Sequence, residues 1–505
     1  MSDLTGKSQL AQNIIVSWLV QILILVAGLI IPRQINDNLG SVSLGIWDLG
    51  WATFRYLTLL NIAAGSSLSR YFAFYRSNDN LEKLRCSVSV FCILQLISSA
   101  IVLLFTTIIS ISADLNTKSS PEAHYLVLVF GLALAIKFVG NTAGGVIAGS
   151  HRFDLQHSIN AIQDIWIALG VVVVLALGGD IIDLSYVVLG ATMLTVTSRI
   201  IVARRICPGV SLLPKVWETD VAKDMLIFGL KAIINTAPRV LTFQTASFSV
   251  AFILGPASLA ILSRSISLLH ICEQMINKIS GMFVPLSGSI SNIEDRDELI
   301  QLVLDSFKIG MALVSPILIG LAAFGNTVID LWMGPGFYQP DVLLTLLIGS
   351  ALPLANSIPA SILVGLNAHG RLGIVSLVLT VLLLMASYLA VYQFYEFTIF
   401  SHVLIVAVVW TISRGFTVPY FIRKEFGISY ISYIWQGIIL PLSLNIPLLV
   451  LLFLTNNYLS AGQFIFAIGS FVSAGVITSI LYWRFILPGF VKQGMVKVLA
   501  IRPHR

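Results

Sequence analysis

Residues 39–85 read LGSVSLGIWDLGWATFRYLTLLNIAAGSSLSRYFAFYRSNDNLEKLR. Within this stretch, residues 43–64 are enough to cross a hydrocarbon layer of roughly 30 Å as an α-helix. The segment nevertheless contains Asp48 and Arg55, which are about two helical turns apart and project from the same face. Because lipid does not tolerate such charges, this face must look into a protein interior or a watery cavity. Asp48 and Arg55 therefore form either a buried structural ion pair or part of a path for an anion.

The composition of the whole chain is that of a polytopic membrane protein. It has 505 residues, of which 57% are hydrophobic and 11% are charged, and its mean hydropathy is +0.92. An ordinary soluble domain is about 25% charged. Long apolar runs that contain Gly and Pro favour helices in lipid over an alternating-residue barrel. The sequence predicts an all-α membrane protein.

Several classes of function are excluded by missing motifs. The sequence contains no Walker A loop, no nucleotide-binding glycine fingerprint and no HExxH helix. An ATP-driven pump that carries its ATP-hydrolysing domain on this chain is therefore excluded. The four cysteines have neither metal-ligand spacing nor the pattern of a disulfide framework. No cofactor is expected, and a proton or a sodium ion is the candidate coupling ion.

Hydropathy predicts fourteen membrane spans. They lie at residues 13–32, 43–64, 86–112, 124–148, 157–178, 184–203, 225–253, 257–283, 302–329, 341–365, 371–394, 399–422, 431–454 and 462–484. Assigning alternate loops to one side places 20 of the 30 basic residues there, with Arg199 counted among them, and only Arg33 and Lys118 on the other side. The positive-inside rule then predicts that both termini are cytoplasmic.

An internal repeat divides the predicted spans into two halves. The sequence LGSVSL at residues 39–44 recurs as LGPASL at residues 254–259, 215 positions later. At nearly the same spacing, NTAGGVIAG from Asn141 is echoed by NSIPASILVG from Asn356. Because transporters are often built from structural repeats, we expect two six-helix lobes and two further helices. The predicted domains are residues 1–208, residues 209–425, and residues 426–505 with a basic cytoplasmic tail.

Ionisable residues within the predicted spans are mostly basic. When the 20 basic residues assigned to one side and the two assigned to the other are subtracted from the 30, eight cations remain, namely Arg55, Lys137, Lys231, Arg239, Arg264, Lys278, Lys308 and Arg414. Three acids are counted against them, namely Asp48, Asp164 and Glu273. Each buried charge is costly, so this excess of cations needs a counter-charge that the chain does not supply. An anionic substrate would supply it.

The position of each charge along its span suggests a role. Arg55, Arg239, Arg264, Lys231 and His270 are the candidate substrate-binding residues. The first three offer planar guanidinium groups that suit phosphate oxygens. His270 is either a mid-membrane group that titrates near neutral pH or a neutral histidine held by a hydrogen bond. Pro238, just before Arg239, breaks the backbone hydrogen-bond ladder and permits a hinge.

The remaining charges within spans suggest coupling groups, counter-ions or lipid contacts. Lys137 and Asp164 fall at comparable depth and form either a structural pair or a coupling pair. Asp48 is a counter-ion for Arg55 or a site for a proton or sodium ion. Three other cations are expected to extend to the lipid headgroups, namely Lys278, Lys308 and Arg414.

Four segments carry a resemblance to a known family. They are GIWDLGWATFRYLTLLNIAAGSSLSRY at 45–71, GVIAGSHRFDLQ at 145–156, LWMGPGFYQP at 331–340 and LVGLNAHGR at 363–371. With fourteen spans, these segments resemble the polysaccharide transporter branch of the multidrug/oligosaccharidyl-lipid/polysaccharide (MOP) flippase superfamily. The chain is most similar to the O-antigen-type flippases, which serve lipopolysaccharide biosynthesis.

The resemblance implies a fold, an activity and partners. It implies two lobes around a cationic cavity. It also implies that the protein moves an undecaprenyl-pyrophosphate-linked oligosaccharide from the cytoplasmic to the periplasmic leaflet of a bacterial inner membrane. Alternating access would be driven by an ion gradient or the membrane potential. The cavity-facing basic positions that match are Arg55, Arg239 and Arg264, while Arg33 departs from the family pattern in the first span. The implied partners are the lipid-linked glycan and membrane lipids, with a polysaccharide polymerase and chain-length machinery as further candidates and no nucleic acid.

Three other functions compete with this prediction. A multidrug and toxin extrusion antiporter has the same architecture but needs acids in its cavity to hold organic cations, and the excess of bases argues against it. A peptidoglycan lipid-precursor flippase has a similar build and is distinguished by being essential for growth. A membrane glycosyltransferase or polymerase would need carboxylates and a sizeable external loop. We expect a transporter and not an enzyme.

Overall fold

The structure is a computed structural model that describes residues 2–61, 65–114, 121–290, 296–394, 396–458 and 464–486. In this part of the chain, eleven helical segments are long and apolar enough to cross a membrane, and they correspond to the third through thirteenth predicted spans. The first predicted span lies on α1 (Ser2–Leu57), most of the second lies on α1 and the 3-10 helix η1 (Thr58–Leu60), and most of the fourteenth lies on α19 (Phe464–Phe485). Residues 62–64 and 462–463 of these spans lie outside the described residues. The predicted all-α polytopic class is therefore confirmed.

The chain forms two compact units, residues 1–260 and residues 261–505. The helices of the first unit are α1 (Ser2–Leu57), the short 3-10 helix η1 (Thr58–Leu60), α2 (Gly65–Ser77), α3 (Leu81–Asp114), α4 (Pro121–Gly149), α5 (Phe153–Ala176), α6 (Ile181–Ile206) and α7 (Thr219–Ile253). The predicted division into residues 1–208, 209–425 and 426–505 rests on the sequence repeat and stays a prediction.

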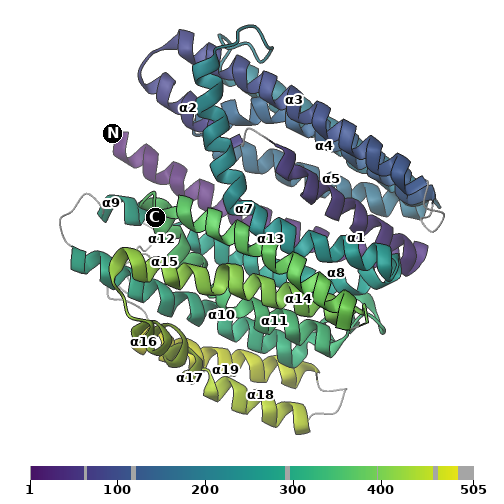
Figure 1. Cartoon of the computed structure of the whole chain (residues 1–505), viewed down its shortest axis with the longest axis vertical. Coiled ribbons are helices and arrows are strands. Elements are labelled where there is room, and N and C mark those ends of the chain that lie inside the picture. Colours follow the sequence, from purple (N-terminus) through teal and green to yellow (C-terminus); the bar gives the residue numbers. More distant parts are fainter. Residues whose placement is uncertain are drawn as a thin grey trace, which may run out of the picture. The chain divides into compact units, whose positions relative to one another are not determined.

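The core of the first unit is built on α3, α4 and α6. Helices α3 and α4 run side by side along most of their length (Figure 1). Ser99 of α3 donates a hydrogen bond of 2.8 Å to the Ala135 carbonyl of α4, so a polar contact joins the two helices in their apolar interface. Gln95 of α3 donates to the Asn61 side chain at 2.9 Å, which fixes the segment that follows α1.

Glycine marks the same turn in both copies of the repeated LG motif. Helix α1 is kinked at Gly40, where φ is 82°. Gly255, between α7 and α8 (Pro256–Ser280), has φ of 94° and lies 215 positions later. Glycine adopts a positive φ without the steric cost that a Cβ imposes. The sequence predicts a loop between residues 32 and 43, but the chain there remains helical and turns sharply only at Gly40.

Gly45 lies so close to a neighbouring backbone that no side chain fits. A Cβ at this position would be 1.8 Å from the Pro256 carbonyl oxygen. We expect Gly45→Ala to destabilise the protein by about 1–3 kcal/mol, because backbone must shift to admit the methyl group. The measurement is the apparent melting temperature of the purified protein. Gly28→Ala on the same helix is the control, because a Cβ there meets nothing within 4 Å. Equal melting temperatures for the two variants would contradict the close approach.

The second unit contains most of α8 and all later elements. They are α8 (Pro256–Ser280), α9 (Phe283–Ile290), α10 (Arg296–Met333), α11 (Pro340–Ala355), α12 (Ser357–Gly365), α13 (His369–Phe394), α14 (Ile399–Trp410), the π-helix η2 (Thr411–Phe416), α15 (Thr417–Phe426), α16 (Tyr430–Ser432), the π-helix η3 (Tyr433–Ile439), α17 (Leu440–Ser443), α18 (Ile446–Tyr458) and α19 (Phe464–Phe485).

Side-chain hydrogen bonds hold the irregular segments of the second unit. Thr411 at the start of η2 donates to the Gly349 carbonyl of α11 at 2.7 Å. Asn356, at the junction of α11 and α12, donates to the Gly415 carbonyl at 2.7 Å. The wider turns of a π-helix disturb the regular backbone ladder, and such segments are frequent at functional sites. Here the π-helix is anchored to α11 and its junction with α12.

Candidate functional site

Arg55 lies in the last turn of α1, and its side chain is exposed. Asp48 is half-buried on the same helix, between the buried residues Trp47 and Leu49. Helix α1 ends two residues after Arg55 and passes into the 3-10 turn η1, where Thr58 donates to the Arg55 carbonyl at 2.6 Å. The end of the helix thus presents an arginine fork at a depth where the sequence predicts membrane.

Helix α7 carries two of the predicted binding residues. Lys231 is exposed, and Arg239 is half-buried with its guanidinium carbon 5.5 Å from the centre of the Phe243 ring. The helix continues through Pro238, and Thr242 donates to the Pro238 carbonyl at 2.7 Å. An arginine against an aromatic face is stabilised by the negative potential of the ring.

The second unit holds the other two predicted binding residues on α8. Arg264 is only 1% exposed, and its guanidinium carbon lies 5.4 Å from the centre of the Trp332 ring of α10. His270 is partly exposed, and its Nδ1 lies 3.0 Å from a carboxylate oxygen of Glu273. His270 therefore has an acidic partner on its own helix, which the sequence analysis did not anticipate. Its role in substrate binding stays a prediction.

A polar group inside the first unit joins α4, α5 and α6. Lys137 lies with its Nζ 5.1 Å from the centre of the Phe54 ring and interacts electrostatically with Asp164 and Arg199. Arg199 is only 4% exposed, and it donates hydrogen bonds to the side-chain oxygens of Asn160 at 2.8 Å and Asn141 at 3.5 Å. The structure thus brings the predicted Lys137 and Asp164 together with an arginine that the sequence analysis missed.

The prediction that Arg199 belongs to a cytoplasmic loop is wrong. Helix α6 runs to Ile206, so Arg199 lies about two turns inside the helix and faces the bundle. The signal that could have found it is the internal repeat, because Arg199 and Arg414 are separated by the same 215 positions as the two LG motifs.

Two cations that were expected to reach the lipid headgroups are held inside the second unit. Lys308 lies 3.2 Å from Asp305, and their side chains are only 16% and 11% exposed. The prediction for Lys308 is wrong because an acid on its own helix, one turn earlier, pairs with it. Asp305 lies within the predicted span at 302–329 and is an acid that the count of three acids did not include. Arg414 lies in η2, and its Nη1 is buried, so this nitrogen does not reach the headgroups.

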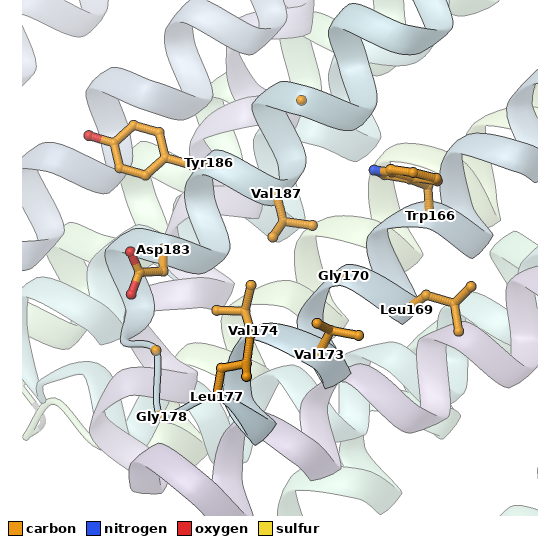
Figure 2. A pocket seen from close by; sticks show the side chains of 12 residues that line it. Trp166, Leu169, Gly170, Val173, Val174, Leu177, Gly178, Asp183, Tyr186 and Val187 are labelled. Atoms are coloured by element: carbon orange, nitrogen blue, oxygen red, sulfur yellow. The ribbon is translucent and has the colours of Figure 1, made fainter.

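An apolar groove of about 840 Å³ lies between α5 and α6 (Figure 2). Trp166, Leu169 and Val173 line it from α5, and Tyr186 and Val187 line it from α6. Of the 12 residues that line the groove, Asp183 alone is charged. A groove of this composition suits hydrocarbon and does not suit a phosphate group.

A second groove of about 840 Å³ lies where α3 begins and where the segment between α6 and α7 crosses the first unit. Lys83, Arg85 and Lys215 line it together with two acids, Glu82 and Glu218. Arg85 donates to the Gly209 carbonyl at 3.1 Å, which attaches the segment to α3. These charges nearly balance, so this groove does not explain the surplus of cations within the spans.

Comparison with solved structures identifies the fold. A lipid II flippase MurJ in an inward closed conformation has a TM-score of 0.69 at 14% identity, covering 94% of this chain and 99% of that one. An inward-facing multidrug resistance MATE family transporter of the MOP superfamily also has a TM-score of 0.69 at 14% identity, covering 82% and 98%. A MOP superfamily transporter from Pyrococcus furiosus, described as having a binding pocket of reverse polarity, has a TM-score of 0.60 at 13% identity, covering 82% and 94%.

Sequence comparison identifies the family. No curated protein matches the chain significantly. The sequence profile of the family described as polysaccharide biosynthesis protein matches residues 73–339, which is more than half of the chain. The chain therefore belongs to the polysaccharide biosynthesis protein family and has the fold of the MOP superfamily of transporters, as its resemblance predicted.

Proposed function

We propose that this protein is a flippase that moves an undecaprenyl-pyrophosphate-linked oligosaccharide from the cytoplasmic to the periplasmic leaflet of a bacterial inner membrane. The observation that carries this proposal is the surplus of basic over acidic side chains within the membrane spans of a MOP fold. A pyrophosphate group neutralises such a surplus, and the polysaccharide biosynthesis family supplies the context of a glycan substrate.

In this mechanism, arginine side chains replace the water that the pyrophosphate loses when it enters the membrane. Arg55 is exposed and Arg239 is half-buried, so both can present guanidinium groups to phosphate oxygens. Arg264 packs against Trp332 and would contact the substrate only in a conformation that separates the two. Lys231 and His270 would add charge around the head group, while the polyprenyl tail stays in the lipid.

A charged head group loses its water when it crosses the membrane, which is costly, so the protein must open to one leaflet at a time. We propose alternating access between the two leaflets, with both termini in the cytoplasm and with a proton or sodium ion as the coupling ion. Asp48 and the Lys137–Asp164 group are the candidate coupling or counter-ion residues, because they are acids or acid–base neighbours within the spans. A polysaccharide polymerase and chain-length machinery remain candidate partners.

The fold alone does not separate this function from its rivals, because the MurJ and MATE structures have the same TM-score. The charge of the interior favours a pyrophosphate-linked lipid over an organic cation. A peptidoglycan lipid-precursor flippase would use the same head-group chemistry, so it is the second candidate, and an essential role in growth is its distinguishing property.

The experiment that tests the proposal is removal of the protein from its cells. We expect loss of surface polysaccharide and accumulation of an intact lipid-linked glycan, measured by gel electrophoresis and by mass spectrometry of extracted lipids. Normal polysaccharide with increased sensitivity to cationic drugs would overturn the proposal in favour of an antiporter. Arrest of growth with accumulation of the peptidoglycan precursor would identify the second candidate instead.

A further inference from the structure

Arg199 is a buried cation whose described hydrogen-bond partners carry no charge. Its Nη2 donates to Asn160 at 2.8 Å and its Nη1 donates to Asn141 at 3.5 Å, and both acceptors are neutral amide oxygens. Its Nε is buried and has no hydrogen-bond partner among the described residues. An arginine that is only 4% exposed normally has an acid or a full set of acceptors. The site is therefore short of negative charge and of at least one acceptor.

The surroundings of Arg199 do not restore the balance. Lys137 interacts electrostatically with Arg199 and with Asp164, so the group contains two bases and one acid. The Gln156 amide faces the same space, because a Cβ on Gly144 would lie 3.5 Å from Gln156 Nε2 and 3.7 Å from Arg199 Nη1. The group thus has a net charge of about +1 and several amides that can contact polar atoms of a ligand.

Helices α4, α5 and α6 hold Asn141, Asn160 and Arg199 at similar distances from the same helix ends. Arg199 lies seven residues before the end of α6, Asn160 lies seven residues after the start of α5, and Asn141 lies eight residues before the end of α4. At about 1.5 Å per residue, each position is roughly 10–12 Å from its helix end. These ends carry the basic residues Arg152, Arg204 and Arg205, so the group lies inward from the basic face.

The repeat places an arginine at the equivalent position of the second half. Arg414 and Asn356 are each 215 positions after Arg199 and Asn141. Arg414 also has a buried guanidinium nitrogen, Nη1, with no hydrogen-bond partner in the described part of its unit. Asn356 donates to the carbonyl of the residue that follows Arg414. Each half of the chain therefore has an interior arginine and an asparagine at equivalent positions of the repeat.

We propose that Arg199, with Asn141, Asn160 and Gln156, forms a second oxyanion site that is separate from Arg55, Arg239 and Arg264. The ligand group is a phosphate or a carboxylate, which supplies both the missing negative charge and acceptors for the guanidinium. This assignment rests on the proposed function in one respect, which is that the oxyanion belongs to the lipid-linked glycan, either to its pyrophosphate or to an acidic sugar.

The test is the thermal stability of the purified full-length protein with and without added oxyanions. To remove the two arginines of the first site that are not packed against Trp332, the protein carries Arg55→Gln and Arg239→Gln. Inorganic pyrophosphate and glucuronate are added separately to distinguish the two sources of the oxyanion. We expect one of them to raise the apparent melting temperature by about 3 °C, as binding to the folded state at a concentration well above its dissociation constant requires.

Two further variants in this background remove the net charge in different ways. Arg199→Gln deletes the cation, and Asn160→Asp supplies an internal counter-ion 2.8 Å from the guanidinium. Both are expected to abolish the anion-dependent shift while leaving the protein at least as stable without anions. A purely structural Arg199 would instead make Arg199→Gln less stable. Arg204→Gln, at an exposed position on the same helix, is the control and keeps the shift.

The outcomes separate this inference from the proposed function. No shift with either oxyanion, or a shift that persists in Arg199→Gln, overturns the second site but leaves the flippase proposal standing. Loss of the shift in Arg199→Gln and Asn160→Asp supports the site, whatever glycan accumulates in cells that lack the protein. The oxyanion that produces the shift identifies the chemical group that the site binds.

Discussion

Replacing Arg55 by alanine is expected to abolish surface polysaccharide while the protein still reaches the membrane. Arg55 is the exposed arginine of α1, and its fork can form two charge-assisted hydrogen bonds to phosphate oxygens. Each such bond contributes roughly 1.5–3 kcal/mol, so the loss of even one of the two lowers the flipping rate by about 10- to 100-fold, and alanine removes both. The measurements are surface polysaccharide by gel electrophoresis, the amount of accumulated lipid-linked glycan, and protein abundance in isolated membranes.

Arg55→Lys separates charge from geometry. Lysine retains the positive charge but offers a point charge in place of a planar fork, so we expect partial polysaccharide synthesis. Arg33→Ala is the matched control on the same helix, because the Arg33 side chain is 39% exposed and forms an i,i+4 ion pair with Asp37 at 2.6 Å. An exposed pair of this kind contributes little to stability. Normal polysaccharide in Arg55→Ala would contradict the assignment of Arg55 to the binding site.

Arg239→Ala and Arg264→Ala extend the test to the other two arginines. Arg239 is half-buried, and its removal is expected to reduce polysaccharide with little change in stability. Arg264 is 1% exposed and packs against Trp332, so its truncation also leaves a cavity and lowers the melting temperature. Arg264→Lys is therefore the more informative variant at this position. Unchanged polysaccharide in all three alanine variants would defeat the proposed site as a whole.

The positions of the membrane helices could be predicted from hydropathy because the bilayer fixes their length and requires their backbone groups to be satisfied internally. The predicted span at 124–148 corresponds to α4 (Pro121–Gly149), and the predicted span at 371–394 corresponds to α13 (His369–Phe394). The π-helix η2 could not be predicted, because the groups that anchor it lie far away in the sequence. Thr411, for example, donates to a carbonyl 62 residues earlier.

The roles of single charges were harder to predict than the helices. Lys308 and Asp305 form an i,i+3 pair. Their spacing is visible in the sequence, but Asp305 was not counted among the acids within the predicted spans. Arg199 was assigned to a loop because it lies near the end of a predicted span, where hydropathy does not fix the helix boundary or the direction of the side chain. The internal repeat would have placed Arg199 inside a span, since it pairs this residue with Arg414. Comparing equivalent positions of the two halves thus helps to decide whether a charged residue lies within a span.

Asp164→Asn is expected to cause a large loss of stability. Asp164 is the acid that interacts with Lys137, and Lys137 also interacts electrostatically with Arg199. Without Asp164, two cations inside the first unit would be left with no acid among their described electrostatic partners. Removal of one partner from a buried charge group costs roughly 3 kcal/mol or more, because the remaining charge stays desolvated. The measurement is the apparent melting temperature of the purified variant, together with its yield in membranes.

A second substitution should reverse this effect. Lys137→Met removes the cation and leaves an apolar chain of similar length, so the double variant Asp164→Asn with Lys137→Met is expected to recover most of the lost stability. The difference between the double variant and the sum of the single variants gives the coupling energy of the pair. If Asp164→Asn is as stable as the wild type, Lys137 does not depend on this acid. The Lys137–Asp164 group would then be a coupling element that tolerates loss of its charge, and not a structural pair.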